Sequence, residues 1–556
     1  MSGANSGSLK RMGEAIPHPA IRKGLSNWTQ LNRLDLLALI AVTLIGATKL
    51  TVPFSADQAI FTIIAEGMRT GAAPYRDLWD VKQPGIFYFC LAGGSLFGFD
   101  EIGIHLFELL YMVVFAMVLL VTLKDLFANR GIASLIPLLT VGVYYAIAGD
   151  WNLTQPESVV GFPIFLSLWF AFKSLQPGRH QTLWLFMSGF MGGVVLVFKF
   201  IFGLILAGFW LTLVWRVVMK HEGDRVATLL KTALSVGFGA LVPLLIMFAH
   251  LTYVGAIDSA LWTFFQYPKS AVGEWPLLNH IDALINGVTW FIGNFAPLMA
   301  LGTIGAYVSW RRHKDYFTLS VILWLPLGFL VILLQPLSWW QYHFMLLSVP
   351  VGLLGAWGLD VLWPKLKEVQ ISASSRQSAV IAGASLLILF SPILTSAGMR
   401  SIELARNGFL KKADRLRYQS NFNNDYRVAL QEVAFLSEPA SLPGSIFVLG
   451  DSLFYYLSRR APAIPFLNAA GSSPPELWAR LVKSLYETRP TYIFLPNNKL
   501  NAIRKGTPRA APYIDETARF IATNYDVSHT SDTGTWYVLR HIVSASQPTE
   551  ASANAR

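Results

Sequence analysis

The chain is organised around the stretch Ser55–Phe89, SADQAIFTIIAEGMRTGAAPYRDLWDVKQPGIFYF, which follows the first strongly apolar run. Aromatic residues and two prolines in this stretch accompany seven charged side chains: Asp57, Glu66, Arg69, Arg76, Asp77, Asp80 and Lys82. Charged groups this close to a membrane are costly unless they face water or one another. The stretch therefore predicts a polar site at a membrane surface, with the rest of the chain as its frame.

The overall composition is that of a membrane protein. Of the 556 residues, 53% are hydrophobic and only 14% are charged, whereas a soluble protein carries about 25% charged residues. Apolar runs of roughly twenty residues recur, and each can cross a bilayer core of about 30 Å. These runs predict a polytopic α-helical membrane protein, because an outer-membrane barrel needs short alternating segments instead.

The net charge of +11 has an explanation that does not involve nucleic acid. Lysine and arginine gather in the short segments between apolar runs, as the positive-inside rule requires of cytoplasmic loops. We therefore expect no nucleic-acid partner. The single cysteine, Cys90, excludes an intramolecular disulfide and a cysteine-based metal site, and we expect it to be a small buried apolar residue.

Charge also decides how many runs cross the membrane. The segment Pro84–Phe97 is apolar but short, and if it spanned, the later basic loops would lie on the outer face. We expect it to be a juxtamembrane or re-entrant helix in the first outer loop, alongside an interfacial helix after Asp57. This leaves about eleven spans and a cytoplasmic N-terminus. The predicted spans are 34–52, 102–123, 132–148, 158–172, 182–198, 201–218, 232–254, 284–308, 317–335, 343–363 and 378–397.

The predicted domain organisation has four parts. Residues 1–32 are polar and basic and predict a cytoplasmic tail, and residues 33–398 form the membrane domain. Residues 399–543 are richer in charge and predict a small periplasmic α/β domain, and residues 544–556 predict a disordered tail. In the third part we expect strands at Ser445–Asp451, Thr491–Leu495 and Thr535–Leu539, and helices at Pro475–Glu487 and Pro512–Asn524.

This topology places a set of polar side chains at one outer membrane level. They come from separate helices and loops: Asp57, Asp80, Lys82, Glu157, Lys199, Gln341, Tyr342 and His343. Acidic and basic groups brought together at one depth predict a cleft that holds an anionic group beside a catalytic carboxylate.

The order of these segments resembles the GT-C membrane glycosyltransferases, and most closely the bacterial protein O-mannosyltransferase and aminoarabinose transferase group. Asp57-Gln58 resembles the acidic pair of the family's first outer loop. Lys82-Gln83-Pro84 resembles its Lys-Pro-Pro motif, with glutamine in place of the first proline. QYHFMLLSVP, from Gln341, resembles an aromatic/His segment ahead of a span, and VLGDSLFYYLSRRAP, from Val448, resembles the outer domain of some members.

The resemblance implies a GT-C-like fold and a reaction. A hexosyl or pentosyl group would pass from a polyprenyl-phosphate donor to an acceptor hydroxyl, with inversion, at the periplasmic face of a bacterial inner membrane. The acceptor would be a glycan, a lipid or a protein. Asp57 would act as general base. The other roles would be donor-phosphate contacts at Lys82, Lys199 and His343, and substrate contacts at Arg76, Asp80, Glu157, Gln341 and Tyr342.

Each of these residues also has a structural interpretation. Asp57 is a good N-cap for a helix beginning near Ala59, and Lys82 can form a surface ion pair with Asp80. Lys199 can extend its ammonium to the interface, and His343 can be a packed interfacial histidine.

Glu157 has two further interpretations. Its carboxylate can be stabilised by the dipole at the N-terminus of a helix, or it can hold a divalent metal together with Asp80. We expect no required cofactor or metal, because no cluster has firm ligand spacing.

Three other functions stay open. A transporter or flippase of lipid-linked saccharides would show internal repeats and mid-membrane charges, which we do not find. A non-catalytic scaffold would leave the charged outer loops unexplained. Finally, Ser452 in Gly-Asp-Ser-Leu, with Asp526 and His529, has the order of a hydrolase triad.

Overall fold

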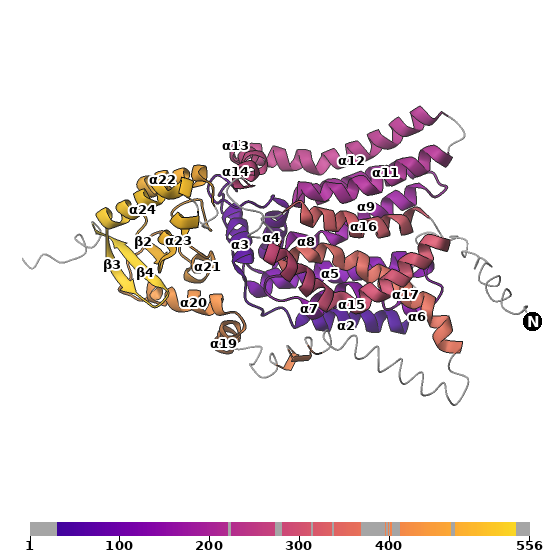
Figure 1. Cartoon of the computed structure of the whole chain (residues 1–556), viewed down its shortest axis with the longest axis horizontal. Coiled ribbons are helices and arrows are strands. Elements are labelled where there is room, and N and C mark those ends of the chain that lie inside the picture. Colours follow the sequence, from indigo (N-terminus) through magenta and orange to yellow (C-terminus); the bar gives the residue numbers. More distant parts are fainter. Residues whose placement is uncertain are drawn as a thin grey trace, which may run out of the picture.

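The computed structural model describes residues 31–220, 224–272, 281–312, 315–335, 339–368, 412–468, 473–506 and 508–540, and residues 395, 398–399 and 401–402. A helical bundle forms most of the molecule, and a smaller domain with a β-sheet lies against one end of it (Figure 1). We call residues 412–540 the C-terminal domain. The adjoining ends of α11 and α12 lie at the opposite end of the bundle (Figure 1).

The bundle is made of apolar helices. Its long elements are α2 (Arg33–Ala47), α5 (Glu101–Leu123), α9 (Gly161–Ser174), α10 (Gln181–Phe198), α11 (Gly203–Lys220), α12 (Arg225–Tyr253), α15 (Ile281–Arg312), α16 (Tyr316–Leu333) and α17 (Ser348–Glu368). Its short elements are α6 (Arg130–Ala133), α7 (Val143–Ile147), α8 (Pro156–Val159), α13 (Ile257–Leu261), α14 (Tyr267–Val272), the 3₁₀ segments η3 (Lys124–Leu126), η5 (Phe200–Phe202) and η9 (Gln341–Leu347), and the π-helical segments η4 (Leu138–Gly142) and η6 (Trp262–Gln266).

Seven helices in the described residues are long and apolar enough to cross a membrane, and the chain is a multi-pass membrane protein. They coincide with seven of the predicted spans. Three other predicted spans are helical but short or broken: α2 has 15 residues, α9 has 14, and η4 interrupts the run from α6 to α7. The last predicted span, 378–397, lies almost wholly outside the described residues, so the count of about eleven stays a prediction.

The opening stretch forms two helices against the end of the bundle, α3 (Ala56–Arg69) and α4 (Gly85–Phe97). The N-cap of α3 is Ser55, whose backbone N–H donates to Gln58 Oε1 at 2.9 Å. The alternative in which Asp57 caps a helix near Ala59 is therefore wrong, and its carboxylate is not used in capping. Gly71, with φ +99°, follows the end of α3. With 13 residues, α4 is the short apolar helix that the sequence predicts.

The C-terminal domain is an α/β unit, as expected. Its sheet has the order β1-β2-β4-β3, with β1 parallel to β2 and the other neighbours antiparallel. The strands are β1 (Ile446–Val448), β2 (Tyr492–Pro496), β3 (Tyr525–Thr530) and β4 (Gly534–Leu539). The helices are α19 (Lys412–Phe422), α20 (Asn424–Glu432), α21 (Leu453–Ser458), α22 (Pro475–Thr488), α23 (Lys499–Gly506) and α24 (Ala511–Asn524), with the 3₁₀ segments η11 (Ala434–Ser437) and η12 (Pro508–Ala510). The sequence did not predict β3, because its side chains after Tyr525 are exposed.

Polar contacts dock the C-terminal domain onto the bundle. The buried carboxylate of Glu101, at the start of α5, accepts hydrogen bonds from the hydroxyls of Tyr426 at 2.9 Å and Tyr456 at 2.8 Å. The backbone N–H of Trp79 donates to the carbonyl of Pro465 at 2.8 Å. A buried carboxylate with two hydroxyl donors fixes orientation as well as contact, so the loop before α4 and the C-terminal domain hold each other in place.

Removing the two hydroxyls tests this docking. We expect the double substitution Tyr426→Phe/Tyr456→Phe to destabilise the detergent-solubilised protein by about 1–3 kcal/mol, because Glu101 loses donors while staying buried. Thermal unfolding of purified protein measures the loss. The matched control is Tyr486→Phe, whose hydroxyl makes no hydrogen bond within the described residues. Equal midpoints for the double variant and the control would contradict the docking role.

Candidate functional site

Asp57 lies in the first turn of α3, where the chain leaves α2 and turns along the end of the bundle. Its Oδ2 forms an ion pair with Lys82 Nζ at 3.3 Å, and both side chains are mostly buried. Gln155 Nε2 approaches the same oxygen at 3.5 Å. The stretch Ser55–Phe89 thus brings the predicted base and the predicted phosphate contact together, although 25 positions separate them.

The loop that carries Lys82 is held by its own hydrogen bonds. Tyr75 donates its hydroxyl to the carbonyl of Lys82 at 2.7 Å, and the Lys82 N–H donates to Asp80 Oδ2 at 3.3 Å. Burial alone would lower the pKa of Lys82, but the nearby acidic groups, Asp57 first, raise it well above its usual value. Burial raises the pKa of Asp80, and the Lys82 charge opposes this. The lysine therefore stays charged, and Asp80 is easier to protonate than a free aspartate.

A second ion pair lies beside the first. Lys199 Nζ and Glu157 Oε1 are 2.8 Å apart, and His343 Nε2 lies 3.5 Å from the same carboxylate oxygen. Glu157 Oε2 and both ring nitrogens of His343 are buried and accept or donate no hydrogen bond within the described residues. Buried polar atoms without partners are rare in folded proteins, so this corner of the site has unused hydrogen-bonding capacity.

Close backbone packing joins the two ion pairs. The N–H of Phe200 donates to Gln83 Oε1 at 2.8 Å. A Cβ atom at Gly85 would lie 2.7 Å from the Cα of Phe198, so only glycine allows the start of α4 to pack against the end of α10. These contacts hold Lys82 and Lys199 on adjoining segments.

The structure brings together seven of the nine residues that the sequence predicted for the site. These are Asp57, Asp80, Lys82, Glu157, Lys199, Tyr342 and His343. Within the described residues, the other two make no hydrogen bond or ion pair with this cluster. Gln341 is exposed. Arg76 is also exposed, where it pairs with Asp77 at 2.8 Å and donates to the carbonyl of Val254.

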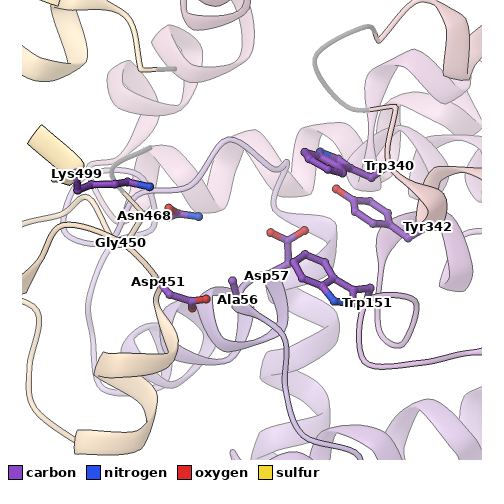
Figure 2. A pocket seen from close by; sticks show the side chains of 9 residues that line it. All are labelled: Ala56, Asp57, Trp151, Trp340, Tyr342, Gly450, Asp451, Asn468 and Lys499. Atoms are coloured by element: carbon purple, nitrogen blue, oxygen red, sulfur yellow. The ribbon is translucent and has the colours of Figure 1, made fainter. Parts of the chain in front are cut away.

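A cavity of about 370 Å³ opens above Asp57 (Figure 2). Figure 2 shows the Asp57 carboxylate between aromatic side chains of the bundle and polar side chains of the C-terminal domain. The lining residues are Ala56, Asp57, Trp151, Trp340, Tyr342, Gly450, Asp451, Asn468 and Lys499. The sequence alone did not assign the lining residues of the C-terminal domain a role at this site. The only sequence signal for them was the Gly-Asp-Ser turn at residues 450–452.

The described residues offer no ready metal site. No group of three or more His, Cys, Asp or Glu side chains in this part of the chain is arranged to hold a metal ion. Glu157 is instead paired with Lys199, and Asp80 accepts from the backbone of Lys82. The expectation that no metal is required stays a prediction.

The proposed hydrolase triad is not assembled. Ser452 is fully buried, and its hydroxyl donates to the carbonyl of Ala56 at 2.6 Å. The ring of His529 stacks on Phe435, and Asp526 pairs with Arg540 at 2.8 Å. A nucleophile needs a base within hydrogen-bond reach, and Ser452 has none among the described residues. The Gly-Asp-Ser turn instead fastens the C-terminal domain to the first turn of α3.

Labelling with a fluorophosphonate probe checks the assignment of Ser452. We expect no covalent labelling of the purified protein at this serine, because it is buried and no base in the described part of the chain activates it. Mass spectrometry of the digested protein gives the result, with a known serine hydrolase as positive control. Labelling that disappears in Ser452→Ala would restore the hydrolase hypothesis.

Comparison with known proteins identifies the fold. Residues 81–253 match the family described as dolichyl-phosphate-mannose-protein mannosyltransferase. None of the curated proteins compared matches the sequence significantly. The matched segment contains Lys82, Glu157 and Lys199, whereas Asp57 and His343 lie outside it.

Solved structures extend the likeness to most of the chain. Apo ArnT from Cupriavidus metallidurans has a TM-score of 0.55 at 14% identity, over 92% of this chain and 99% of that one. The same protein bound to undecaprenyl phosphate gives 0.55 at 14% identity, over 90% and 97%. Archaeal oligosaccharyltransferase AglB from Archaeoglobus fulgidus, in complex with an inhibitory peptide and a dolichol-phosphate, gives 0.51 at 12% identity, over 93% and 75%. The expected resemblance to the GT-C membrane glycosyltransferases is confirmed, and the chain has their fold.

Proposed function

We propose that this protein transfers a sugar from a polyprenyl-phosphate donor to an acceptor hydroxyl, with Asp57 as the general base. One observation carries the proposal: a carboxylate and an ammonium, Asp57 and Lys82, lie 3.3 Å apart beside a cavity at the end of a membrane bundle. The undecaprenyl phosphate and dolichol-phosphate bound to two of the fold relatives support the choice of donor class.

The reaction follows from this arrangement. Asp57 accepts the proton of the acceptor hydroxyl, and the acceptor oxygen forms a bond to the anomeric carbon of the donor sugar. The bond between that carbon and the phosphate oxygen breaks, and its electron pair stays on the polyprenyl phosphate. Attack from the side opposite the leaving group inverts the anomeric centre. The base returns its proton to water after the product leaves.

The leaving phosphate gains negative charge in the transition state and needs fixed cations. Lys82 and Lys199 supply two, on adjoining segments that Gln83 and Gly85 hold together. Cations placed in advance in a water-poor site stabilise developing charge without reorganising. The unpartnered atoms of Glu157 and His343 add hydrogen-bonding capacity at the same corner.

The charge of the cluster bears on how it accepts an anionic ligand. Asp57, Asp80 and Glu157 face Lys82 and Lys199 within this cluster. Burial raises the pKa of Asp80, which makes this carboxylate easier to protonate than a free aspartate. Protonation of Asp80 would lower the electrostatic cost of adding a phosphate.

The orientation in the membrane is part of the proposal. Basic residues gather where α11 ends and α12 begins, at Arg216, Lys220 and Arg225, and these ends lie away from the C-terminal domain (Figure 1). The positive-inside rule makes that end cytoplasmic. We therefore place the site and the C-terminal domain at the periplasmic face of a bacterial inner membrane, with the N-terminus in the cytoplasm.

Substitution of the base tests the proposal. In vesicles supplied with a panel of polyprenyl-phosphate sugars and a membrane glycolipid extract, we expect Asp57→Asn to lower the transfer rate by about 10²- to 10⁴-fold, because the amide cannot accept the proton. Release of polyprenyl phosphate and radiolabelled product gives the rate. Donor binding should persist, since Lys82 and Lys199 remain.

The matched control is Asp77→Asn in the same loop, because Asp77 is exposed and pairs with Arg76 outside the site. We expect this variant to transfer at the wild-type rate. An undiminished rate in Asp57→Asn, with the same fold and donor binding, would contradict the assignment of the base.

A further inference from the structure

The cavity has two walls of different chemistry. The bundle supplies Asp57 and three aromatic side chains, Trp151, Trp340 and Tyr342. The C-terminal domain supplies a carboxylate, an amide and an ammonium, and we call Asp451, Asn468 and Lys499 the C-terminal wall. Figure 2 shows this wall facing the aromatic side chains across the space above Asp57.

Asp451 is held close to Asp57 by the docking of its domain. The next residue, Ser452, donates to the carbonyl of Ala56, which precedes Asp57. Asp451 Oδ1 accepts from the Leu453 N–H at 2.8 Å, which fixes the carboxylate at the lining of the cavity. Burial first, and then the charges of Asp425 and Asp57, raise the pKa of Asp451 to about 6, against the opposing effect of the Leu453 hydrogen bond.

Lys499 provides the opposite charge in the same wall. It begins α23 after Asn498, whose φ of +57° turns the chain between β2 and the helix. Within the described residues, no carboxylate lies within ion-pair distance of its ammonium, although Asp451 lines the same cavity. The wall thus presents a carboxylate and an ammonium that do not neutralise each other.

Two of the three aromatic side chains opposite are accessible, whereas Tyr342 is buried. Trp151 is 48% exposed and Trp340 is 55% exposed. Tryptophan rings at a bundle end are commonly membrane anchors, but these two share a cavity with charged groups. Flat apolar rings that face hydrogen-bonding groups match a sugar ring, which has apolar C–H faces and a polar edge.

We propose that the C-terminal wall is an acceptor subsite and that the acceptor is a saccharide. Asp451 and the Asn468 carbonyl accept hydrogen bonds from its hydroxyls, Lys499 donates to its oxygens, and the tryptophans cover its apolar faces. This inference rests on the proposed function in one respect. The lysines of the bundle hold the donor phosphate, so the acceptor lies on the other side of Asp57.

Binding of neutral sugars tests the subsite without any transfer. Tryptophan fluorescence of the purified full-length protein is followed during titration with methyl glycosides and short oligosaccharides, and with serine- and threonine-containing peptides. We expect a saturable change with at least one saccharide and none with the peptides. Asp451→Asn and Lys499→Gln should each weaken that affinity about tenfold, because each removes a charged hydrogen-bond partner.

Two matched substitutions test whether the effect on saccharide affinity is specific to the C-terminal wall. Asp526→Asn and Lys483→Gln alter exposed charges elsewhere in the C-terminal domain and should bind like the wild type. The wild-type affinity should also weaken as the pH falls through about 6, because protonated Asp451 no longer accepts as a carboxylate. Asp57, Asp425 and Lys499 also face the Asp451 carboxylate. The loss of affinity at low pH should therefore disappear in Asp451→Asn, which keeps these three groups and removes only the Asp451 carboxylate.

The experiments that test the acceptor subsite have outcomes distinct from those that test the proposed transfer reaction. In the transfer assay, Asp451→Asn and Lys499→Gln should raise the KM for the acceptor about tenfold and leave the KM for the donor unchanged. Absence of saccharide binding, peptide binding in its place, or wild-type affinity in both variants would overturn the subsite. Absence of transfer by the wild-type protein, with saccharide binding intact, would overturn the proposed function and leave the subsite standing.

Discussion

The 3.3 Å contact between the Asp57 carboxylate and the Lys82 ammonium is the interaction around which this end of the molecule is built. Ionised groups next to a bilayer must be paired or hydrated. Here each of the two charges is paired with the other, beside the cavity. Its geometry depends on Ser55, which caps α3 and so frees Asp57 from that task. It depends equally on the hydrogen bonds that hold the loop around Lys82. A second pair, Glu157 with Lys199, lies beside it on segments that pack through Gly85.

The C-terminal domain is part of this arrangement rather than an appendage. Two of its tyrosine hydroxyls donate to the buried carboxylate of Glu101, and the Ser452 hydroxyl donates to the carbonyl of Ala56, next to Asp57. The Gly-Asp-Ser turn, which has the residues of a hydrolase motif, therefore acts as a fastener for α3. The same turn places Asp451 at the cavity. One short segment thus joins the two domains and completes the wall opposite the aromatic side chains.

The sequence predicted the helical class and most long spans, because apolar runs of that length are visible in it directly. It also predicted most charged residues of the cluster, because charged residues next to apolar runs are equally visible. It did not predict that Arg76 pairs with the adjacent Asp77, because such a local ion pair cannot be inferred from the sequence alone. No sequence pattern indicates that Trp151 and Trp340 line one cavity with Asp57. Asp451 and Lys499 lie about four hundred residues from Asp57, and contacts at such separation depend on domain docking, which no local pattern reports.

The central claim is that a polyprenyl phosphate binds beside Lys82 and Lys199. Photocrosslinking tests it most directly, with a polyprenyl phosphate that carries a diazirine near its phosphate, in vesicles containing the full-length protein. We predict labelled peptides from the loop before α4 and from the junction of α10 and α11, with labelling reduced by unmodified undecaprenyl phosphate and by the double substitution Lys82→Gln/Lys199→Gln. Labelling that is confined to the basic ends of α5, α11 and α12, and that is insensitive to this substitution, would contradict the account.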